Sequence, residues 1–405
     1  MTHKTDQPIA IFIQSLKAGG AERSTLNLAN ALAATGIRVD LIMMDETGVF
    51  AHQVSPLVKT VKLKKSSIFK AIWSLRHQWR DIVYLLRLSI LPGSPKPYTA
   101  IPELIRYIRE EKPGVVLSVL DYGNIATIVA AAASGIKTRT IIGQRNHFSR
   151  EYVGRAQWRR DQVIPTIRYF YKRADAIVSV SKGVAQDLCE SLNIPPERVY
   201  AIYNAVTNDL LKRQMEEELD HPWFSDKQIP VILAAGKLKP QKDFQTLLRA
   251  FAKVCEQKKA RLIILGEGAL RRELTILAQQ LNIAENVSFE GFVENPFKFM
   301  RRSDLFVLSS RHEGLPGVLI QAIACGCPVV STDCPSGPAE ILENGKFGEL
   351  VPVGDADKLA DVIIRNLDIH HDRQALTERG NFFSEKTAIK NYLSVIFPDF
   401  HNAEQ

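Results

Sequence analysis

The chain has 405 residues, of which 24% are charged and 45% are hydrophobic. This composition is typical of a globular protein, and the length suits two domains of about 200 residues each. No window approaches the ~20 apolar residues that a membrane-spanning helix needs, and we expect no secretion signal because the N-terminus runs directly into a predicted strand. The five cysteines lack CxxC spacing, which favours free thiols in a reducing cytoplasm over disulfides or zinc.

The N-terminal half alternates short apolar runs with helical segments. Strands are predicted at residues 8–13, 37–43, 115–119, 138–142, 176–180 and 199–202. Continuous apolar runs are typical of parallel strands that helices cover on both faces. Residues 1–206 are therefore predicted to form one doubly wound, Rossmann-like α/β domain.

Two features of this half follow predicted strands, at the edge where open α/β folds bind ligands. Gly19 and Gly20 follow the first strand and would let the backbone approach a ligand closely, although a plain tight turn explains them as well. They do not form the GxGxxG pattern, which argues against a dehydrogenase. His147 follows the strand at 138–142, where it could contact a substrate, with a structural role as the alternative.

The net charge of +8 is compatible with nucleic acid, an anionic membrane or phosphate-bearing substrates. Its distribution narrows the choice, because residues 59–87 hold eight basic residues and one acid, Asp81. Between residues 66 and 91 a stripe of apolar residues at spacings of three and four predicts one helical face: Ile68, Ile72, Leu75, Trp79, Ile82 and Leu86. Such a stripe with aromatic residues and basic flanks favours a helix in an anionic membrane interface, and a core-facing helix is the alternative.

The second half repeats the organisation of the first. A polar stretch at 207–228 contains no predicted strand, so we place a linker between domains there. Residues 229–385 are predicted to form a second Rossmann-like domain. Residues 386–405 are expected to be a tail whose helix returns to the N-terminal domain.

The C-terminal domain is centred on residues 309–326, which are predicted to form a polar loop and a helix between two buried strands. Pro316 suits the first helical turn, and Gly326 suits the position just past the helix end. A helix that starts directly after a parallel strand presents its free amides at the carboxyl edge of the sheet, where they suit a phosphate.

Glu313 lies in this loop and Gln321 lies eight residues later, inside the helix. Two polar side chains with phosphate-ready amides between them fit a ligand that has both hydroxyls and phosphates, such as a nucleotide sugar. A helix cap plus a surface Gln is the alternative interpretation.

Lys237 and Lys242 flank a loop after the first strand of the C-terminal domain, and Gly266 and Gly268 follow the second strand. Two ammonium groups near helix-start amides suit a diphosphate whose negative charge grows as its bond to a sugar breaks. Surface lysines in a polar loop are the alternative. This chemistry needs no metal, and Asp355-Ala356-Asp357 is interpreted as a helix cap in place of a cation site.

At these residues the chain resembles a retaining family 4 glycosyltransferase of the GT-B fold, in which two Rossmann-like domains face each other across a cleft. The resemblance runs from about residue 8 to residue 367 and is strongest over 236–354. The family's Glu, seven residues, Glu pattern is present as Glu313 and Gln321. The family more often has Arg where this chain has Lys237.

The resemblance implies roles for individual residues. Glu313, Lys242 and Lys237 would be catalytic, with Glu313 facing the transferred sugar and the lysines holding the donor diphosphate. The donor would be bound by Gly236, Gly266, Gly268, Gly314, Leu315, Pro316, Gly317 and Gln321. The acceptor side would include Gly19, Gly20, Arg145 and His147, with either Arg145 or His147 matching the family's acceptor-side His. Gln321 replaces the Glu that usually holds the ribose hydroxyls; its amide still forms hydrogen bonds but carries no charge.

The resemblance further implies transfer of a hexosyl or N-acetylhexosaminyl group with retention and without a metal or other cofactor. The expected donor is a UDP-sugar, with a GDP-sugar as the alternative. The expected acceptor is a lipid-linked or oligosaccharide glycan of a bacterial surface polysaccharide or glycolipid. The protein is expected to be cytoplasmic and peripheral on the inner face of the cytoplasmic membrane, whose anionic surface it would contact. No nucleic acid is expected as a partner. The rival hypotheses are a sugar-nucleotide epimerase or hydrolase, and a non-catalytic protein that binds a sugar or a membrane.

Overall fold

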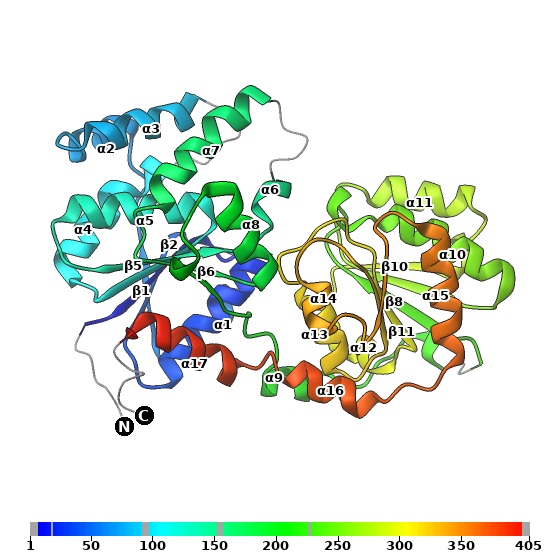
Figure 1. Cartoon of the computed structure of the whole chain (residues 1–405). Coiled ribbons are helices and arrows are strands. Elements are labelled where there is room, and N and C mark those ends of the chain that lie inside the picture. The colour runs from blue at the N-terminus through cyan, green and yellow to red at the C-terminus, as the bar shows by residue number, and fades with distance from the viewer. Residues whose placement is uncertain (1–6, 18, 91–96, 152–156, 226–227, 399–405) are drawn as a thin grey trace. The chain divides into compact units, whose positions relative to one another are not determined.

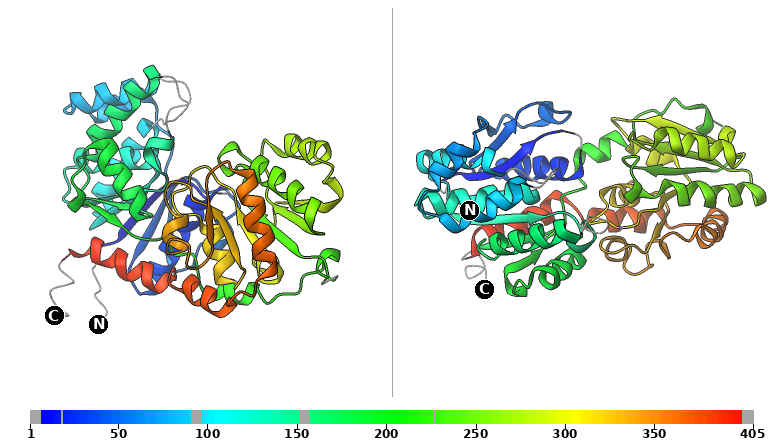
Figure 2. Two further views of the ribbon diagram at one scale, coloured as in Figure 1. Left: turned by 45° about the vertical axis from the view of Figure 1, so that its right-hand side comes forward. Right: turned by 90° about the horizontal axis from the view of Figure 1, so that it is seen from above.

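The computed structural model describes residues 7–17, 19–90, 97–151, 157–225 and 228–398. The chain forms two compact units. The first comprises Met1–Ala205 and Glu385–Gln405, and the second comprises Val206–Ser384. Each unit is a parallel β-sheet covered by helices, as Figures 1 and 2 show.

The segment 207–228, predicted as a linker, belongs to the second unit. It contains helix α9 (Asp209–Gln214), whose last carbonyl accepts a hydrogen bond of 2.8 Å from the Asn295 amide. The tail begins with helix α17 (Glu385–Ile396), which packs against the first unit. Residues 399–405 of the predicted tail lie outside the described residues.

The described residues of the first unit form a seven-stranded sheet in the order β3-β2-β1-β4-β5-β6-β7, with every neighbouring pair parallel. The strands are β1 (Ile9–Ser15), β2 (Val39–Asp45), β3 (Val58–Lys62), β4 (Val115–Val119), β5 (Arg139–Gln144), β6 (Ala176–Ser179) and β7 (Val199–Ala201). The predicted strands match six of these, and the edge strand β3 was not predicted.

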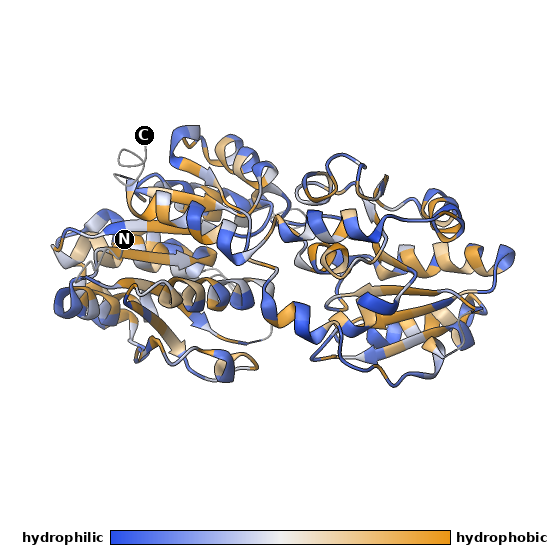
Figure 3. Ribbon diagram, turned by 90° about the horizontal axis from the view of Figure 1, so that it is seen from below, coloured by the Kyte–Doolittle hydropathy of each residue, from blue (hydrophilic) through white to orange (hydrophobic). Residues whose placement is uncertain are grey.

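Both faces of this sheet are covered, which is why its central strands are apolar, whereas the edge strands β3 and β7 are partly exposed. The helices are α1 (Gly20–Ala34), α2 (Ile68–Ser74), α3 (Trp79–Ile90), α4 (Ile101–Glu111), α5 (Leu120–Ser134), α6 (Phe148–Glu151), α7 (Gln157–Tyr171) and α8 (Lys182–Leu192), together with α17. Successive strand residues point to opposite faces, so Ile11 packs in the cluster that contains α1 and α17, while Phe12 packs in the cluster that contains α4 and α5. Figure 3 shows these strands as hydrophobic segments.

The single helix predicted between residues 66 and 91 is instead two helices, α2 and α3. Helix α2 ends at Ser74, and a turn follows in which the Gln78 amide donates to the Leu75 carbonyl at 2.7 Å. The prediction was wrong because a spacing of three and four continues in register across a turn of this length, so the periodicity alone does not reveal the break.

The described residues of the second unit form a six-stranded parallel sheet in the order β10-β9-β8-β11-β12-β13. The strands are β8 (Val231–Ala235), β9 (Arg261–Leu265), β10 (Val287–Gly291), β11 (Leu305–Leu308), β12 (Val329–Thr332) and β13 (Glu349–Val351). The helices after α9 are α10 (Phe244–Gln257), α11 (Arg271–Gln280), α12 (Phe297–Arg302), α13 (Gly317–Ala324), α14 (Pro338–Ile341), α15 (Ala356–Asp368) and α16 (Arg373–Asn381). Helices α10, α11 and α15 share one core cluster with the sheet.

The five cysteines are free, and Cys325, Cys327 and Cys334 are buried. Burial raises the pKa of the Cys325 and Cys334 thiols to about 12 each. Among the described residues, every helix is too short or too polar to cross a bilayer.

The loops after β8 and β9 touch through their backbones, and glycine is what permits this. Gly266 has φ +137°, and a Cβ there would overlap the Gly236 carbonyl oxygen. A Cβ on Gly268 would overlap the Leu238 backbone, while the Leu238 amide donates to the Glu267 carbonyl at 2.9 Å. These glycines are therefore required by the packing of one loop on the other.

We predict that Gly266→Ala lowers the free energy of unfolding by about 1–3 kcal/mol or more, because it adds both backbone strain and an overlap. Thermal or urea unfolding of the full chain measures this. Gly20→Ala is the matched control, since a Cβ there meets nothing within 4 Å and Ala favours a helix over Gly by up to about 1 kcal/mol. Equal stability of the two variants would contradict the packing argument.

Candidate functional site

The candidate site of the second unit lies where the strand order of its sheet reverses. Strands β8 and β11 are neighbours, although β9 and β10 come between them in the sequence. In open α/β sheets, ligands bind at the carboxyl ends of the strands beside such a reversal. The loop that carries Lys242 follows β8, and the loop that carries Glu313 follows β11, so both predicted residues lie at this position.

Lys242 and Glu313 form an ion pair across the two loops. The Lys242 Nζ lies 2.6 Å from the Glu313 Oε1, and the two side chains are only 14% and 9% exposed. The Ser310 hydroxyl donates to the same Oε1 at 2.6 Å. Within the described residues no hydrogen bond reaches the other carboxylate oxygen, Oε2. The pair thus presents a fixed cation beside a carboxylate that keeps one oxygen for a ligand.

Helix α13 begins directly after this loop. Pro316 is its N-cap and so lies one position before the predicted first turn, and no described side chain caps the helix. The first amides of any helix lack partners within it and attract anions. Gly314, Leu315 and Pro316 are buried, whereas Gly317 and Gln321 are partly exposed. The Gly326 φ of +72° fits its predicted place just past the helix end.

Lys237 is exposed and forms no ion pair with the described residues. Its neighbour Gly236 packs against the Lys242 side chain, since a Cβ on Gly236 would lie 3.3 Å from the Lys242 Cε. Gly236 therefore leaves room for the Lys242 side chain, and Gly266 leaves room for the backbone of Gly236. The loops after β8, β9 and β11, which carry the predicted lysines, glycines and Glu313, thus lie at one edge of the sheet, and Gln321 lies further along α13.

In the first unit the strand order reverses between β1 and β4. Gly19 and Gly20 follow β1 there, and Gly19 is the N-cap of α1. A Cβ on Gly19 would overlap the carboxylate of Glu22, which folds over it. Asp121 follows β4 at the same reversal and accepts a 2.7 Å hydrogen bond from the Tyr171 hydroxyl. We did not predict Asp121, although its place directly after a predicted strand could have indicated it.

Arg145 and His147, at the end of β5, have different surroundings. Arg145 is buried, and its guanidinium donates to Asn204 at 2.5 Å and to the Tyr392 hydroxyl of α17 at 3.4 Å. Its hydrogen bonds therefore hold the unit's own elements together.

The His147 Nδ1 lies 3.0 Å from an Asp187 oxygen that also accepts the Ser149 amide at 3.0 Å. Burial acts to raise the pKa of Asp187, but the hydrogen bonds from His147 and Ser149 outweigh burial and lower it below its usual value. A carboxylate that holds Nδ1 fixes the ring and leaves Nε2 for another partner. Of the two acceptor-side candidates, His147 is thus the one whose geometry suits a ligand.

Asp355 caps helix α15 by accepting the Lys358 amide at 2.8 Å, as its sequence context predicts. No three His, Cys, Asp or Glu side chains gather in a metal-binding arrangement among the described residues.

Comparison with known proteins decides the family. Residues 18–210 match the model for "Glycosyltransferase Family 4" and residues 215–381 match that for "Glycosyl transferases group 1". A Campylobacter jejuni N-acetylgalactosamine-N,N'-diacetylbacillosaminyl-diphospho-undecaprenol 4-alpha-N-acetylgalactosaminyltransferase is 30% identical over 87% of this chain and 88% of its own length. The chain belongs to glycosyltransferase family 4. It is a glycosyltransferase.

Solved structures support the fold. HepE from Anabaena, crystallised with UDP, aligns with a TM-score of 0.72 and 18% identity over 96% of this chain and 99% of its own. The lipopolysaccharide outer core galactosyltransferase WaaB aligns with a TM-score of 0.70 and 19% identity over 97% of this chain and 99% of its own. At these identities the likeness shows the fold alone, and that fold is GT-B.

A second contact between the two loops of this glycosyltransferase was not predicted. Arg311 holds Asp243 with both arms of its guanidinium, through Nε to Oδ2 at 3.0 Å and through Nη2 to Oδ1 at 3.2 Å. Asp243 is buried, has φ +48° and also accepts the Thr246 hydroxyl at 2.9 Å. The side-chain amide of Gln241 donates to the His312 carbonyl at 2.7 Å. These bonds fasten the residues on both sides of Lys242 to the loop that carries Glu313.

We predict that Asp243→Ala costs about 1–3 kcal/mol of unfolding free energy, because the buried Thr246 hydroxyl and one guanidinium lose their partner. It should also raise the KM for the donor, because Lys242 is no longer fixed opposite Glu313. Asp243→Asn, which keeps the shape, should recover part of both losses. Arg249→Ala, at an exposed position of α10, is the control. An Asp243→Ala enzyme with wild-type stability and donor KM would refute the positioning role.

Proposed function

We propose that this glycosyltransferase transfers a hexosyl or N-acetylhexosaminyl group from a UDP-sugar, or alternatively a GDP-sugar, to a lipid-linked glycan. The transfer proceeds with retention of anomeric configuration and without a metal, at the inner face of the bacterial cytoplasmic membrane. The name of the Campylobacter jejuni relative describes an acceptor linked to diphospho-undecaprenol. The Anabaena HepE structure contains UDP. Both support the proposal.

The observation that carries the proposal is the buried pair of Lys242 and Glu313 at the strand reversal of the second unit. Departure of a nucleoside diphosphate leaves growing negative charge on its phosphates. A preorganised ammonium group in a poorly hydrated site stabilises that charge as it forms. Lys242 supplies this cation, the exposed Lys237 can add a second, and the amides at the start of α13 add fixed dipoles. Such a field takes the place of a divalent metal.

Glu313 has two tasks in this scheme. Through Oε1 it holds Lys242 in place, and through Oε2 it accepts a hydroxyl of the sugar that is being transferred. Because Lys242 is already paired when no donor is present, a diphosphate must compete with Glu313 for the ammonium group. The binding energy for the donor is then modest in the ground state and increases as phosphate charge develops, which is what catalysis requires.

We predict that Glu313→Gln and Lys242→Met each reduce kcat by roughly 100-fold or more, the loss typical when a preorganised charge is removed. The wild-type enzyme is assayed with UDP-, GDP- and dTDP-sugars and membrane extract, with chelator present, and NMR of the product determines the anomer. The double variant Glu313→Gln/Lys242→Met leaves no unpaired buried charge. It should therefore be more stable than Lys242→Met alone but equally inactive.

Near-wild-type transfer by both single variants would refute these roles. Loss of transfer in chelator, or an inverted product, would refute the metal-free retaining mechanism. Arg249→Ala again serves as the control.

Gln321 provides a test of nucleotide binding. It lies on α13, partly exposed, where the family usually has the Glu that holds ribose hydroxyls. A carboxylate can accept hydrogen bonds from two ribose hydroxyls. The Gln side chain can accept a hydrogen bond only through its amide oxygen, because its amide nitrogen donates. Gln321→Glu should therefore keep kcat and lower the KM for the preferred nucleotide sugar, by up to about tenfold if one charge-assisted hydrogen bond is gained. Donor titration measures this change. A complete loss of activity would show that the Gln has a different role.

A further inference from the structure

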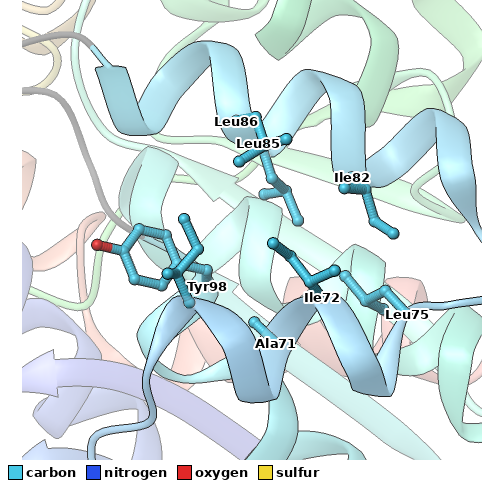
Figure 4. Close-up of a pocket in the computed structure, with 8 residues that line it drawn as sticks. Ala71, Ile72, Leu75, Ile82, Leu85, Leu86 and Tyr98 are labelled. Atoms are coloured by element: carbon cyan, nitrogen blue, oxygen red, sulfur yellow. The ribbon is translucent and has the colours of Figure 1, made fainter.

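Helices α2 and α3 form a hairpin whose inner face is apolar and encloses a small pocket. The chain doubles back between them, and Figure 4 shows side chains of both helices pointing toward one another, with Tyr98 beside them. The residues that line the pocket between the two helices are Ile68, Ala71, Ile72, Leu75, Ile82, Leu85, Leu86 and Tyr98. Helix α3 packs on α7 and α2 packs on α4, so the hairpin forms an outer layer of the first unit (Figures 1 and 2). The hairpin is therefore held to the unit by residues other than those that it exposes to solvent.

The hairpin nonetheless exposes large aromatic side chains. Phe69 is 80% exposed, Trp73 is 71% exposed and Trp79 is 65% exposed. Val83 of α3 is exposed as well, and Leu86, which also lines the inner pocket, is partly open to solvent at 36%. Exposed apolar residues that gather on one element mark a surface that binds a partner. We call these five residues the apolar surface of the hairpin.

Arginines lie over the aromatic rings. The guanidinium carbon of Arg76 is 4.8 Å from the Trp73 ring centre, and that of Arg80 is 5.4 Å from the Trp79 ring centre. Arg87 lies 5.1 Å from the Tyr84 ring centre. Positive charge and exposed rings therefore share one surface.

The charges on the hairpin divide into two groups. Lys70 is bound to the buried Glu103, with the Lys70 Nζ 2.7 Å from Oε1, and its hydrogen bond lowers the pKa of Glu103 against the effect of burial. The only acid of the hairpin, Asp81, is buried and binds Arg173 at 2.5 Å. These two pairs fasten the hairpin to the unit. The cations without an acidic partner among the described residues are Lys64, Lys65, Arg76, Arg80 and Arg87.

We propose that the apolar surface of the hairpin and these five cations dock the enzyme on an anionic lipid bilayer. Aromatic rings favour the headgroup region, arginine and lysine attract anionic headgroups, and the aliphatic residues enter the acyl boundary. Phosphates of nucleic acid would match the cations but would leave the exposed Phe69 and Val83 without a partner. The inference rests on the proposed function, because a lipid-linked acceptor requires the enzyme to reach a membrane. It assigns Lys70 to the hairpin's attachment and not to lipid binding.

The test measures sedimentation of the full chain with vesicles of phosphatidylcholine alone or mixed equally with phosphatidylglycerol. The wild-type protein should bind the mixed vesicles, and binding should fall as salt rises. Arg76→Gln/Arg80→Gln/Arg87→Gln should weaken binding by roughly 100-fold, since each cation near an anionic surface contributes about a fivefold effect. The control Arg249→Gln/Lys259→Gln/Arg272→Gln removes the same charge from exposed positions of the second unit and should bind as the wild type does.

The aromatic residues are tested without a disruptive variant. Bromine-labelled lipids in the mixed vesicles should quench the tryptophan fluorescence of the wild-type protein, and Trp73→Phe/Trp79→Phe should abolish most of that quenching. Equal binding to both vesicle types, or equal quenching in both proteins, would overturn the proposal. Self-association that Phe69→Ser/Trp73→Ser abolishes would overturn the proposal in favour of a second copy of the chain. Preferential binding of nucleic acid would overturn it in favour of a nucleic-acid partner.

Transfer to a short, water-soluble acceptor separates this inference from the proposed function. The arginine variant should transfer to that acceptor at the wild-type rate and lose activity only on membrane-bound acceptor. If the wild-type enzyme transfers sugar but does not bind vesicles, the docking surface is wrong and the function stands. If it binds vesicles but transfers no sugar, the function is wrong and the docking surface stands.

Discussion

The ion pair of Lys242 and Glu313 is the interaction on which the second unit of this glycosyltransferase depends. Both charges are almost fully removed from water, and such a pair at best balances its desolvation cost. Its presence is therefore better explained by what it does to a ligand than by stability. The surrounding structure serves to hold it. Gly236 and Gly266 let two loops touch, Ser310 holds the carboxylate, and the bond of Arg311 to Asp243 fastens one loop to the other.

The sequence predicted the core of each sheet well because buried parallel strands are continuous apolar runs. Strand β4 at Val115–Val119 has the predicted bounds. The missed strands lie at edges. Strand β3 at Val58–Lys62 alternates valine with lysine and threonine, so it was assigned to the basic segment, and β13 has only three residues, Glu349–Val351. An edge strand is stabilised by main-chain bonds to one neighbour, and those bonds leave no apolar signature.

The candidate site was predictable to the extent that it follows from topology. Parallel strands bring the loops after β8 and β11 together, so Lys242 and Glu313 could be placed near each other from sequence alone. The contact of Arg311 with Asp243 could not, because it depends on the positive φ of Asp243, which no spacing reveals. The different surroundings of Arg145 and His147 were equally hidden, since they depend on Tyr392 and Asp187, which are distant in the sequence.

The basic hairpin shows why periodicity alone cannot assign a partner. Its apolar residues continue at helical spacing through the turn, yet the structure directs Ile72, Leu75 and Ile82 inward and leaves Phe69, Trp73 and Trp79 outside. The same separation applies to charge. Lys70 is bound to a buried acid, whereas Arg76, Arg80 and Arg87 lie over exposed rings. A single helix would have to offer one stripe either to the core or to a lipid surface. A hairpin of two short helices can do both, because its inner residues fold the element and its outer residues remain available to a membrane.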